Sequence, residues 1–203
     1  SPPPQHPTPI LNPSTQGETI PQLHNRIATT LSTLISTLDT EIAHLEAPLP
    51  PEQRTSKAVL ICSHAAPLIA MGRVLTGNMP EDEGVEDFRV YTAGISMFVR
   101  RSSWDRKGDG DGDGKGRDIK EVLAPGTEVL RDGVYVPDWM GGRGVGGGWE
   151  CVRNGDCGFL SHGAERGWHF CGDESFDTGP MADPSATPTT SLDSSVETAG
   201  SKL

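Results

Sequence analysis

Large apolar and aromatic side chains are scarce in this chain of 203 residues. Hydrophobic residues make up 34% of it and aromatic residues 5%, so we expect a modest core. No apolar run approaches the roughly 20 residues of a membrane-spanning helix, and no secretory-type apolar segment opens the sequence. We therefore expect no membrane association. The sequence begins with Ser1 instead of Met, which indicates a processed chain or a fragment.

Positive charge and cysteine are also in short supply. The chain has 17 Lys and Arg residues against 28 Asp and Glu, a net charge of −11. Electrostatic nucleic-acid binding needs a basic surface that replaces counterions, so we expect no direct contact with DNA or RNA. Four cysteines are too few for a disulfide scaffold, which favours a reducing intracellular compartment.

The clearest element is an amphipathic helix that begins near Thr19. Its apolar residues recur at spacings of three and four: Ile20, Leu23, Ile27, Leu31, Leu34, Leu38, Ile42 and Leu45. That spacing predicts one apolar helix face. Thr19 is a suitable N-cap, and the proline cluster that begins at Pro48 ends the helix.

A strand, a tight turn and a second helix are predicted over residues 57–77. The run 57–62 (KAVLIC) is almost continuously apolar, as in a central strand of a parallel sheet that is buried on both faces. His64 follows it, and we expect the helix after His64 to end at Gly77, because glycine is the usual left-handed residue at a helix C-terminus. In open α/β sheets ligands gather at the carboxyl ends of strands. His64 and the amide of Ala65 would meet there, where a helix N-terminus favours an anion such as phosphate. The alternative is a histidine that only caps the helix.

Later segments give weaker patterns. Residues 88–101 predict one or two strands interrupted at Gly94, and short strands are predicted at 128–130 and 134–136. The glycine-rich run 141–148 is interpreted as a flexible link. We divide the chain into five parts: a Pro-rich linker (1–17), the main domain (18–101), a Gly/Asp-rich insertion with short strands (102–148), a compact aromatic module (149–178) and a disordered tail (179–203).

Three segments in order resemble the histidine phosphatase (phosphoglycerate mutase-like) superfamily. Residues 59–77 (VLICSHAAPLIAMGRVLTG) are similar to its second-histidine motif, 17–26 (GETIPQLHNR) to the helix start before it, and 92–98 (TAGISMF) to the strand after it. The resemblance implies an α/β fold, here the C-terminal half of that superfamily's three-layer sandwich. It assigns His64 as a catalytic and phosphate-binding residue, with Ala65 beside it, and it implies a phosphomonoester hydrolase or mutase that needs no metal or cofactor.

The superfamily's nucleophile is absent from this chain. Its Arg-His-Gly motif carries the histidine that takes the phosphoryl group, and no Arg-His-Gly occurs here; His24-Asn-Arg26 does not fit it. The resemblance therefore predicts a domain that holds phosphate through His64 but does not turn over a substrate by itself. The substrate is not indicated.

Residues 147–176 resemble the C-terminal extension of fungal members of this superfamily, among them the tau fifty-five type subunit of the TFIIIC complex of RNA polymerase III. This resemblance implies the alternative function, a non-catalytic subunit of a nuclear transcription complex that binds a protein partner. Aromatic residues and arginine are common anchors of protein interfaces. The candidate partner-binding residues are Trp149, Phe159, Arg166, Trp168 and Phe170. Alternatively, these aromatic residues cover an open sheet edge.

Three further patterns are discounted. Residues 109–114 (DGDGDG) begin like an EF-hand loop, but Lys120 stands at position 12 and no helices flank the loop. The set Cys151, Cys157, His162, His169 and Cys171 lacks the Cys-x₂-Cys pair of structural zinc sites. The final residues 201–203 (SKL) match a peroxisomal signal, so a peroxisome or the cytoplasm is the alternative to the nucleus.

Overall fold

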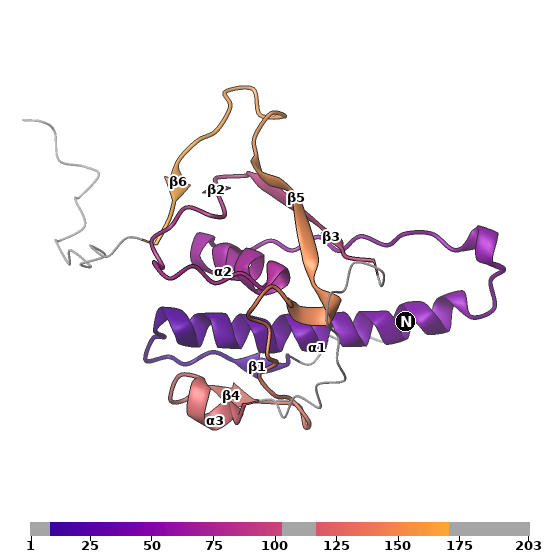
Figure 1. Cartoon of the computed structure of the whole chain (residues 1–203), viewed down its shortest axis with the longest axis horizontal. Coiled ribbons are helices and arrows are strands. Elements are labelled where there is room, and N and C mark those ends of the chain that lie inside the picture. The colour runs from indigo at the N-terminus through magenta and orange to yellow at the C-terminus, as the bar shows by residue number, and fades with distance from the viewer. Residues whose placement is uncertain (1–8, 103–116, 171–203) are drawn as a thin grey trace, which may run out of the picture. The chain divides into compact units, whose positions relative to one another are not determined.

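The computed structural model describes residues 9–102 and 117–170, which form a mixed arrangement of helices and short strands (Figure 1). The elements in chain order are β1 (Leu11–Asn12), α1 (Ile20–Glu46), η1 (Pro51–Gln53), α2 (Ala65–Thr76), β2 (Val90–Tyr91), β3 (Ile95–Arg100), α3 (Ile119–Val122), β4 (Glu128–Val129), η2 (Val145–Gly147), β5 (Trp149–Asp156) and β6 (Gly167–Trp168). The EF-hand-like run, the predicted tail and the C-terminal tripeptide lie outside the described residues.

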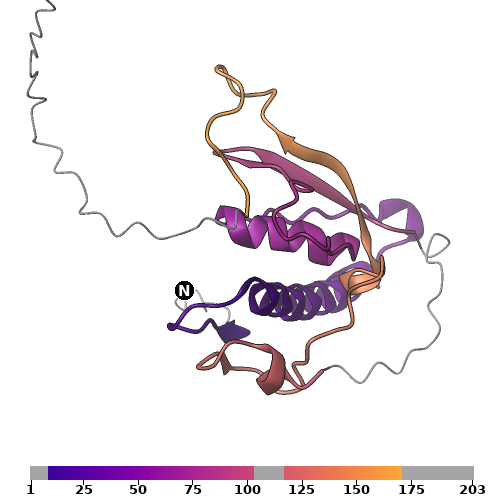
Figure 2. The same ribbon diagram turned by 60° about the vertical axis from the view of Figure 1, so that its left-hand side comes forward.

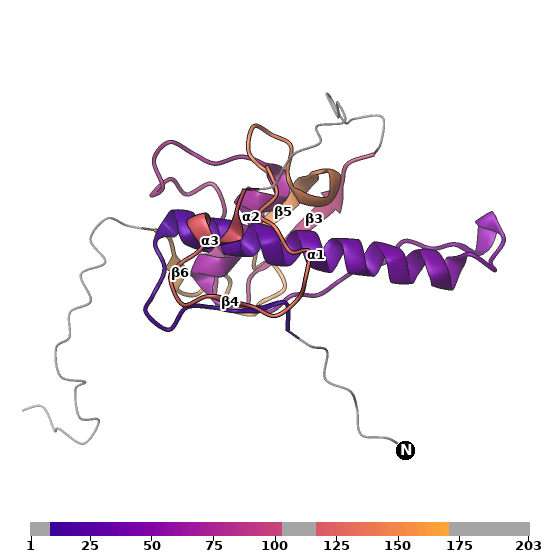
Figure 3. The ribbon, with the colours of Figure 1, turned by 90° about the horizontal axis from the view of Figure 1, so that it is seen from below.

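Helix α1 confirms the predicted amphipathic helix. Thr19 is its N-cap in extended backbone, and a capping box joins the Thr19 and Gln22 side chains to each other's backbone N–H groups. The box satisfies two amides that the first turn leaves free. Only the first half of the apolar stripe is covered, since Leu31 is buried whereas Leu45 is 69% exposed. Seen from below, the later turns of α1 run on past α2 (Figure 3).

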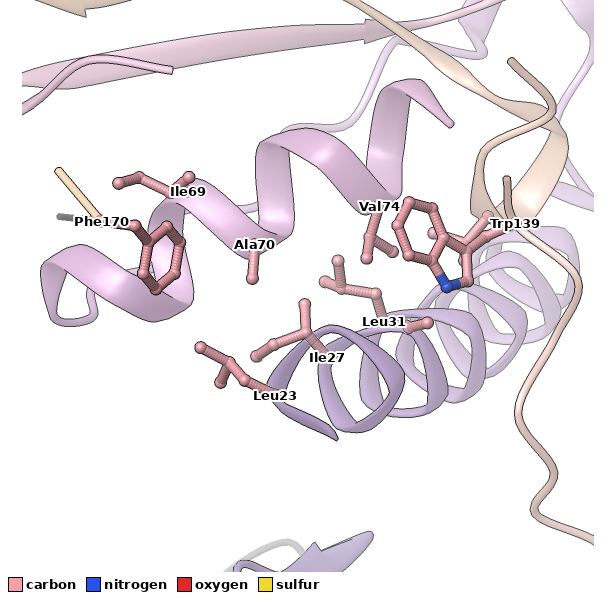
Figure 4. Close-up of a cluster of buried hydrophobic side chains, with 10 residues drawn as sticks. Leu23, Ile27, Leu31, Ile69, Ala70, Val74, Trp139 and Phe170 are labelled. Atoms are coloured by element: carbon pink, nitrogen blue, oxygen red, sulfur yellow. The ribbon is translucent and has the colours of Figure 1, made fainter. Parts of the chain in front are cut away.

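Helix α2 packs across the first half of α1 and forms the core with it. Leu23, Ile27 and Leu31 of α1 face Ala70 and Val74 of α2 (Figure 4). Two aromatic residues from distant segments, Trp139 and Phe170, lie at opposite ends of this contact. The prediction of this helix is confirmed, including its end: Gly77 takes the left-handed conformation and donates its N–H to the Arg73 carbonyl.

The described residues form three two-stranded antiparallel sheets, β1 with β4, β2 with β6, and β3 with β5, and one isolated antiparallel bridge between Arg117 and Val136. The β3–β5 ribbon lies on the side of α2 opposite to α1 (Figure 2). Two strands interrupted near Gly94 confirm the expectation for residues 88–101. Within the described part of the chain, however, no strands are parallel, so the fold shown is mixed α/β and nothing more specific.

The prediction of a buried strand at 57–62 is wrong in this structure. Residues 57–62 form no helix or strand, and every one of them is exposed. The apolar run predicted a strand with a neighbour on each side, but no described segment pairs with it. Apolar composition alone does not bury a strand when the neighbouring strands are missing.

Two further predictions need correction. The glycine-rich run 141–148 is a packed segment, because Val145 is buried and a Cβ on Gly144 would lie 2.1 Å from the Leu75 carbonyl oxygen. Glycine permits this close approach to the end of α2. The N-terminal linker is also partly structured, since Leu11 pairs with Val129 in β1–β4.

Candidate functional site

His64 stands where the sequence placed it, at the start of α2. It is the N-cap residue, with extended backbone (φ −85°, ψ 168°), and its side chain makes no capping hydrogen bond. Its carbonyl accepts the N–H of Leu68. The side chain is exposed. The imidazole is therefore not used to cap the helix, which removes the alternative that it serves as a local cap.

The first-turn amides of α2 lie beside this histidine. Ala65 and Ala66 have no hydrogen-bond acceptor for their N–H groups among the described residues, and Pro67 has no N–H. Free first-turn amides and the helix dipole attract an anion. No described hydrogen bond or ion pair links His64 to a second charged side chain. The first-turn amides and the exposed imidazole favour an anion at this position.

An ion pair between a buried arginine and a half-buried aspartate holds the loop after α2. Arg73 is fully buried, and its guanidinium donates to both carboxylate oxygens of Asp87 at 2.9–3.1 Å and to the carbonyls of Glu83 and Val85 at 3.0 Å. It also lies 5.4 Å from the Phe170 ring. This network ties the loop after α2 to the helix. Sequence reasoning missed it, although an arginine within an otherwise apolar helix was a visible signal.

A second buried polar group lies next to the core. The ring of His24 stacks 6.0 Å from Trp139, and its Nδ1 lies 2.8 Å from the Ile20 carbonyl. Burial is the main cause that lowers the pKa of His24, and the positive charge of Arg73 acts in the same direction. His24 Nε2, Trp139 Nε1 and one Arg73 nitrogen have no partner among the described atoms. Burial therefore favours the neutral form of the His24 ring, which packs against Trp139.

The five candidate partner-binding residues do not share one surface. Phe170 is buried in the core, and Trp168 packs edge-on against it at 5.1 Å. Trp149 is half-buried and donates its indole N–H to the Val145 carbonyl. Only Phe159 and Arg166 are exposed, in the loop between β5 and β6. Phe170 and Trp168 therefore pack with the core that α1 and α2 form, and residues 149–156 pair with β3.

Metal ligands are not clustered in the described part of the chain: no group of three His, Cys, Asp or Glu side chains there could hold a metal ion. Cys171, one member of the five-residue zinc set, lies outside it. No described helix is long and apolar enough to cross a membrane.

A small hollow of about 220 Å³ is lined by Glu86, Arg89, Tyr91, Trp168 and His169, among others. It does not include His64. The phosphate site predicted from the sequence and this hollow are therefore separate features.

The chain matches no family model, no curated protein and no solved structure.

Proposed function

We propose that this chain is the C-terminal part of a histidine-phosphatase-type domain, in which His64 and the N-terminus of α2 bind a phosphate group. The observation that carries the proposal is the pairing of an exposed His64 side chain, uncommitted to capping, with the free amides of Ala65 and Ala66. The resemblance of residues 59–77 to the second-histidine motif is our reason for proposing this superfamily. It implies a three-layer sandwich for the complete domain.

The role of each group follows from its chemistry. The two amides donate to phosphate oxygens, and a ring N–H of His64 adds a third hydrogen bond. The core contact between α1 and α2 holds these donors on a rigid helix. With no Arg-His-Gly sequence in this chain, the phosphoryl-accepting histidine would have to come from elsewhere. Alone, the chain binds phosphate and releases none from an ester.

The proposal is tested by titrating the chain with inorganic phosphate and following the amide resonances of Ala65 and Ala66 by NMR. We expect saturable shifts with a dissociation constant of roughly millimolar order, because an isolated helix N-terminus is a weak site. His64→Ala should weaken binding roughly fivefold, corresponding to the loss of one hydrogen bond of about 1 kcal/mol.

His44→Ala is the matched control, because His44 is also an exposed histidine but lies near the end of α1. It should leave the phosphate titration unchanged. Shifts that never saturate, or equal losses in both variants, would contradict phosphate binding at His64. A phosphate-release assay on the full-length gene product, with its His64→Ala variant, then tests the enzymatic role.

The alternative, a non-catalytic subunit of a TFIIIC-type complex, is favoured by one observation: Phe159 is 57% exposed in the β5–β6 loop, near Arg166 in sequence. An exposed phenylalanine is a suitable interface anchor. Deleting the whole module would remove Phe170 from the core, so the sharper test is Phe159→Ala. It should reduce recovery of TFIIIC subunits at least several-fold, whereas Leu45→Ala, at another exposed apolar position, should not.

A further inference from the structure

Strand β5 contains a bulge at Asn154, and of the four asparagines in the chain only this one precedes a glycine. The register of the β3–β5 ribbon shifts by one residue here, so that Asn154 and Gly155 together stand opposite Ser96 alone. Gly155 has φ +63°, a left-handed conformation that glycine takes readily and that is common in bulges. A Cβ at Gly155 would lie 2.8 Å from the carbonyl oxygen of Arg89. The bulge therefore requires glycine after Asn154.

The side chain of Asn154 holds the loop that follows α2. Its Oδ1 accepts the N–H of Arg89 and its Nδ2 donates to the carbonyl of Asp87, both at 2.8 Å. The amide thus pairs with the backbone on both sides of Phe88, as a neighbouring antiparallel strand would. Because the Asp87 carboxylate also binds Arg73, this asparagine connects the ion pair of α2 to β5.

An asparagine followed by glycine can deamidate without an enzyme. The glycine nitrogen loses its proton and bonds to Cγ of the asparagine, while the Cγ–Nδ2 bond breaks and ammonia leaves with that proton. Glycine has no Cβ to hinder this approach. Water then opens the five-membered imide at either carbonyl and gives aspartate or isoaspartate.

The fold holds both reacting groups of this pair apart. The N–H of Gly155 donates to Ser96 Oγ at 3.0 Å, and the two polar atoms of the Asn154 side chain are occupied by the loop after α2. Attack on Cγ therefore requires the side chain to leave two hydrogen bonds and the nitrogen to leave a third. All three break together only when the bulge opens locally, a motion that native proteins make rarely.

We propose that Asn154 and Gly155 form a deamidation site that opening of the bulge controls, and that modification releases the loop after α2. Aspartate at position 154 has no N–H for the Asp87 carbonyl and would set a carboxylate oxygen against it. Isoaspartate adds a methylene group to the main chain and so changes the register on which the bulge depends. Neither product restores the contact, so each opening that leads to reaction is recorded permanently.

The first test measures the rate of deamidation. The whole chain is incubated at mildly alkaline pH, and conversion of Asn154 is followed by peptide mapping with mass spectrometry. A peptide of residues 152–156, in which nothing holds the reacting groups, is the reference. We expect conversion in the chain to be at least tenfold slower than in the peptide, because the reactive state forms only by local opening.

Ser96→Ala should speed conversion in the chain about fivefold, because the N–H of Gly155 loses its acceptor. Ser161→Ala is the matched control, since Ser161 is also an exposed serine but lies in the β5–β6 loop; it should leave the rate unchanged. Equal rates in the chain and the peptide, or equal rates in the two variants, would show that the fold does not control the reaction. An absence of conversion in the peptide as well would overturn the site itself.

The second test measures the consequence of modification. Asn154→Asp should speed hydrogen exchange of the Arg89 amide at least fivefold, because the side chain that accepts it is repelled by the Asp87 carbonyl. Asn78→Asp makes the same charge change at an exposed asparagine outside the bulge and should leave this exchange unchanged. Unchanged exchange in Asn154→Asp would show that modification does not release the loop. Neither test involves phosphate, so a failure here is distinct from a failure of the proposed function.

Discussion

Two apolar stretches flank His64, and one of them is buried whereas the other is exposed. Helix α2, after it, buries Ile69, Ala70 and Val74 against α1, whereas the run before it leaves Leu60 84% exposed. Both are rich in apolar residues, and residues 57–62 were predicted to form a buried strand. The difference is the neighbour: α1 lies beside α2, but no described strand lies beside residues 57–62. Burial is a property of the pair of surfaces, not of either sequence alone.

The largest effect is expected in the packed region, at Arg73. Arg73→Ala should lower the free energy of unfolding by about 4 kcal/mol, because it leaves a cavity in the core and removes the donor of the half-buried Asp87 carboxylate and of two loop carbonyls. Arg143→Ala should cost less than about 1 kcal/mol, since the pair of Arg143 with Asp138 is solvent-exposed. Urea unfolding monitored by circular dichroism measures both. Equal losses would mean that the Arg73 network does not anchor the helix.

The next effect tests whether the glycine-rich segment belongs to the packed region. Gly144→Ala should destabilise the protein by about 3 kcal/mol, because its Cβ would collide with the Leu75 carbonyl and φ is +67°. At Gly141, φ is +70° but no atom lies within 4 Å of the added Cβ, so Gly141→Ala should cost only about 1 kcal/mol. If both substitutions cost the same in thermal melts, the segment is not packed as described.

A pair of leucines compares the two stretches directly. Leu31→Ala should cost about 2.5 kcal/mol, because Leu31 is 3% exposed and its truncation leaves a cavity. Leu60→Ala should change the free energy of unfolding by less than about 0.5 kcal/mol, as expected for an exposed residue. A cost at position 60 as large as that at position 31 in chemical denaturation would show that residues 57–63 are buried in solution.

The smallest expected effect is the contribution of His24 to the pH dependence of stability, which is absent at neutral pH. Burial lowers the pKa of His24 below its ordinary value of 6.5, so the folded state favours the neutral ring. The unfolded state then binds the proton more readily, and stability should fall as the pH drops below about 6.5. His24→Phe should remove part of this fall in the melting temperature between pH 7.5 and 5.5, measured against a His44→Phe control. An unchanged pH dependence would place His24 in water.

Local sequence signals predicted the two longer helices, α1 and α2, but not the short helix α3. The capping residue Thr19 and the three-four spacing predicted α1, and Gly77 predicted the end of α2, because capping, helix periodicity and left-handed glycine act within a few residues. Contacts between distant segments were not predictable in this way. The pairing of Arg73 with Asp87 and the stacking of His24 on Trp139 depend on how loops return to the core, and no local pattern encodes that return.

The candidate site also has one part that the sequence predicted and another part that it did not. Its position, an N-cap histidine followed by free amides, follows from the sequence, because a strand-like run, a histidine and a helix start fix where His64 stands in the chain. Its surroundings were decided by tertiary structure alone. The segment before His64 is uncovered, Phe170 lies in the core instead of at an interface, and the 141–148 glycines are packed. In each case the outcome depended on whether a complementary surface was present to exclude water.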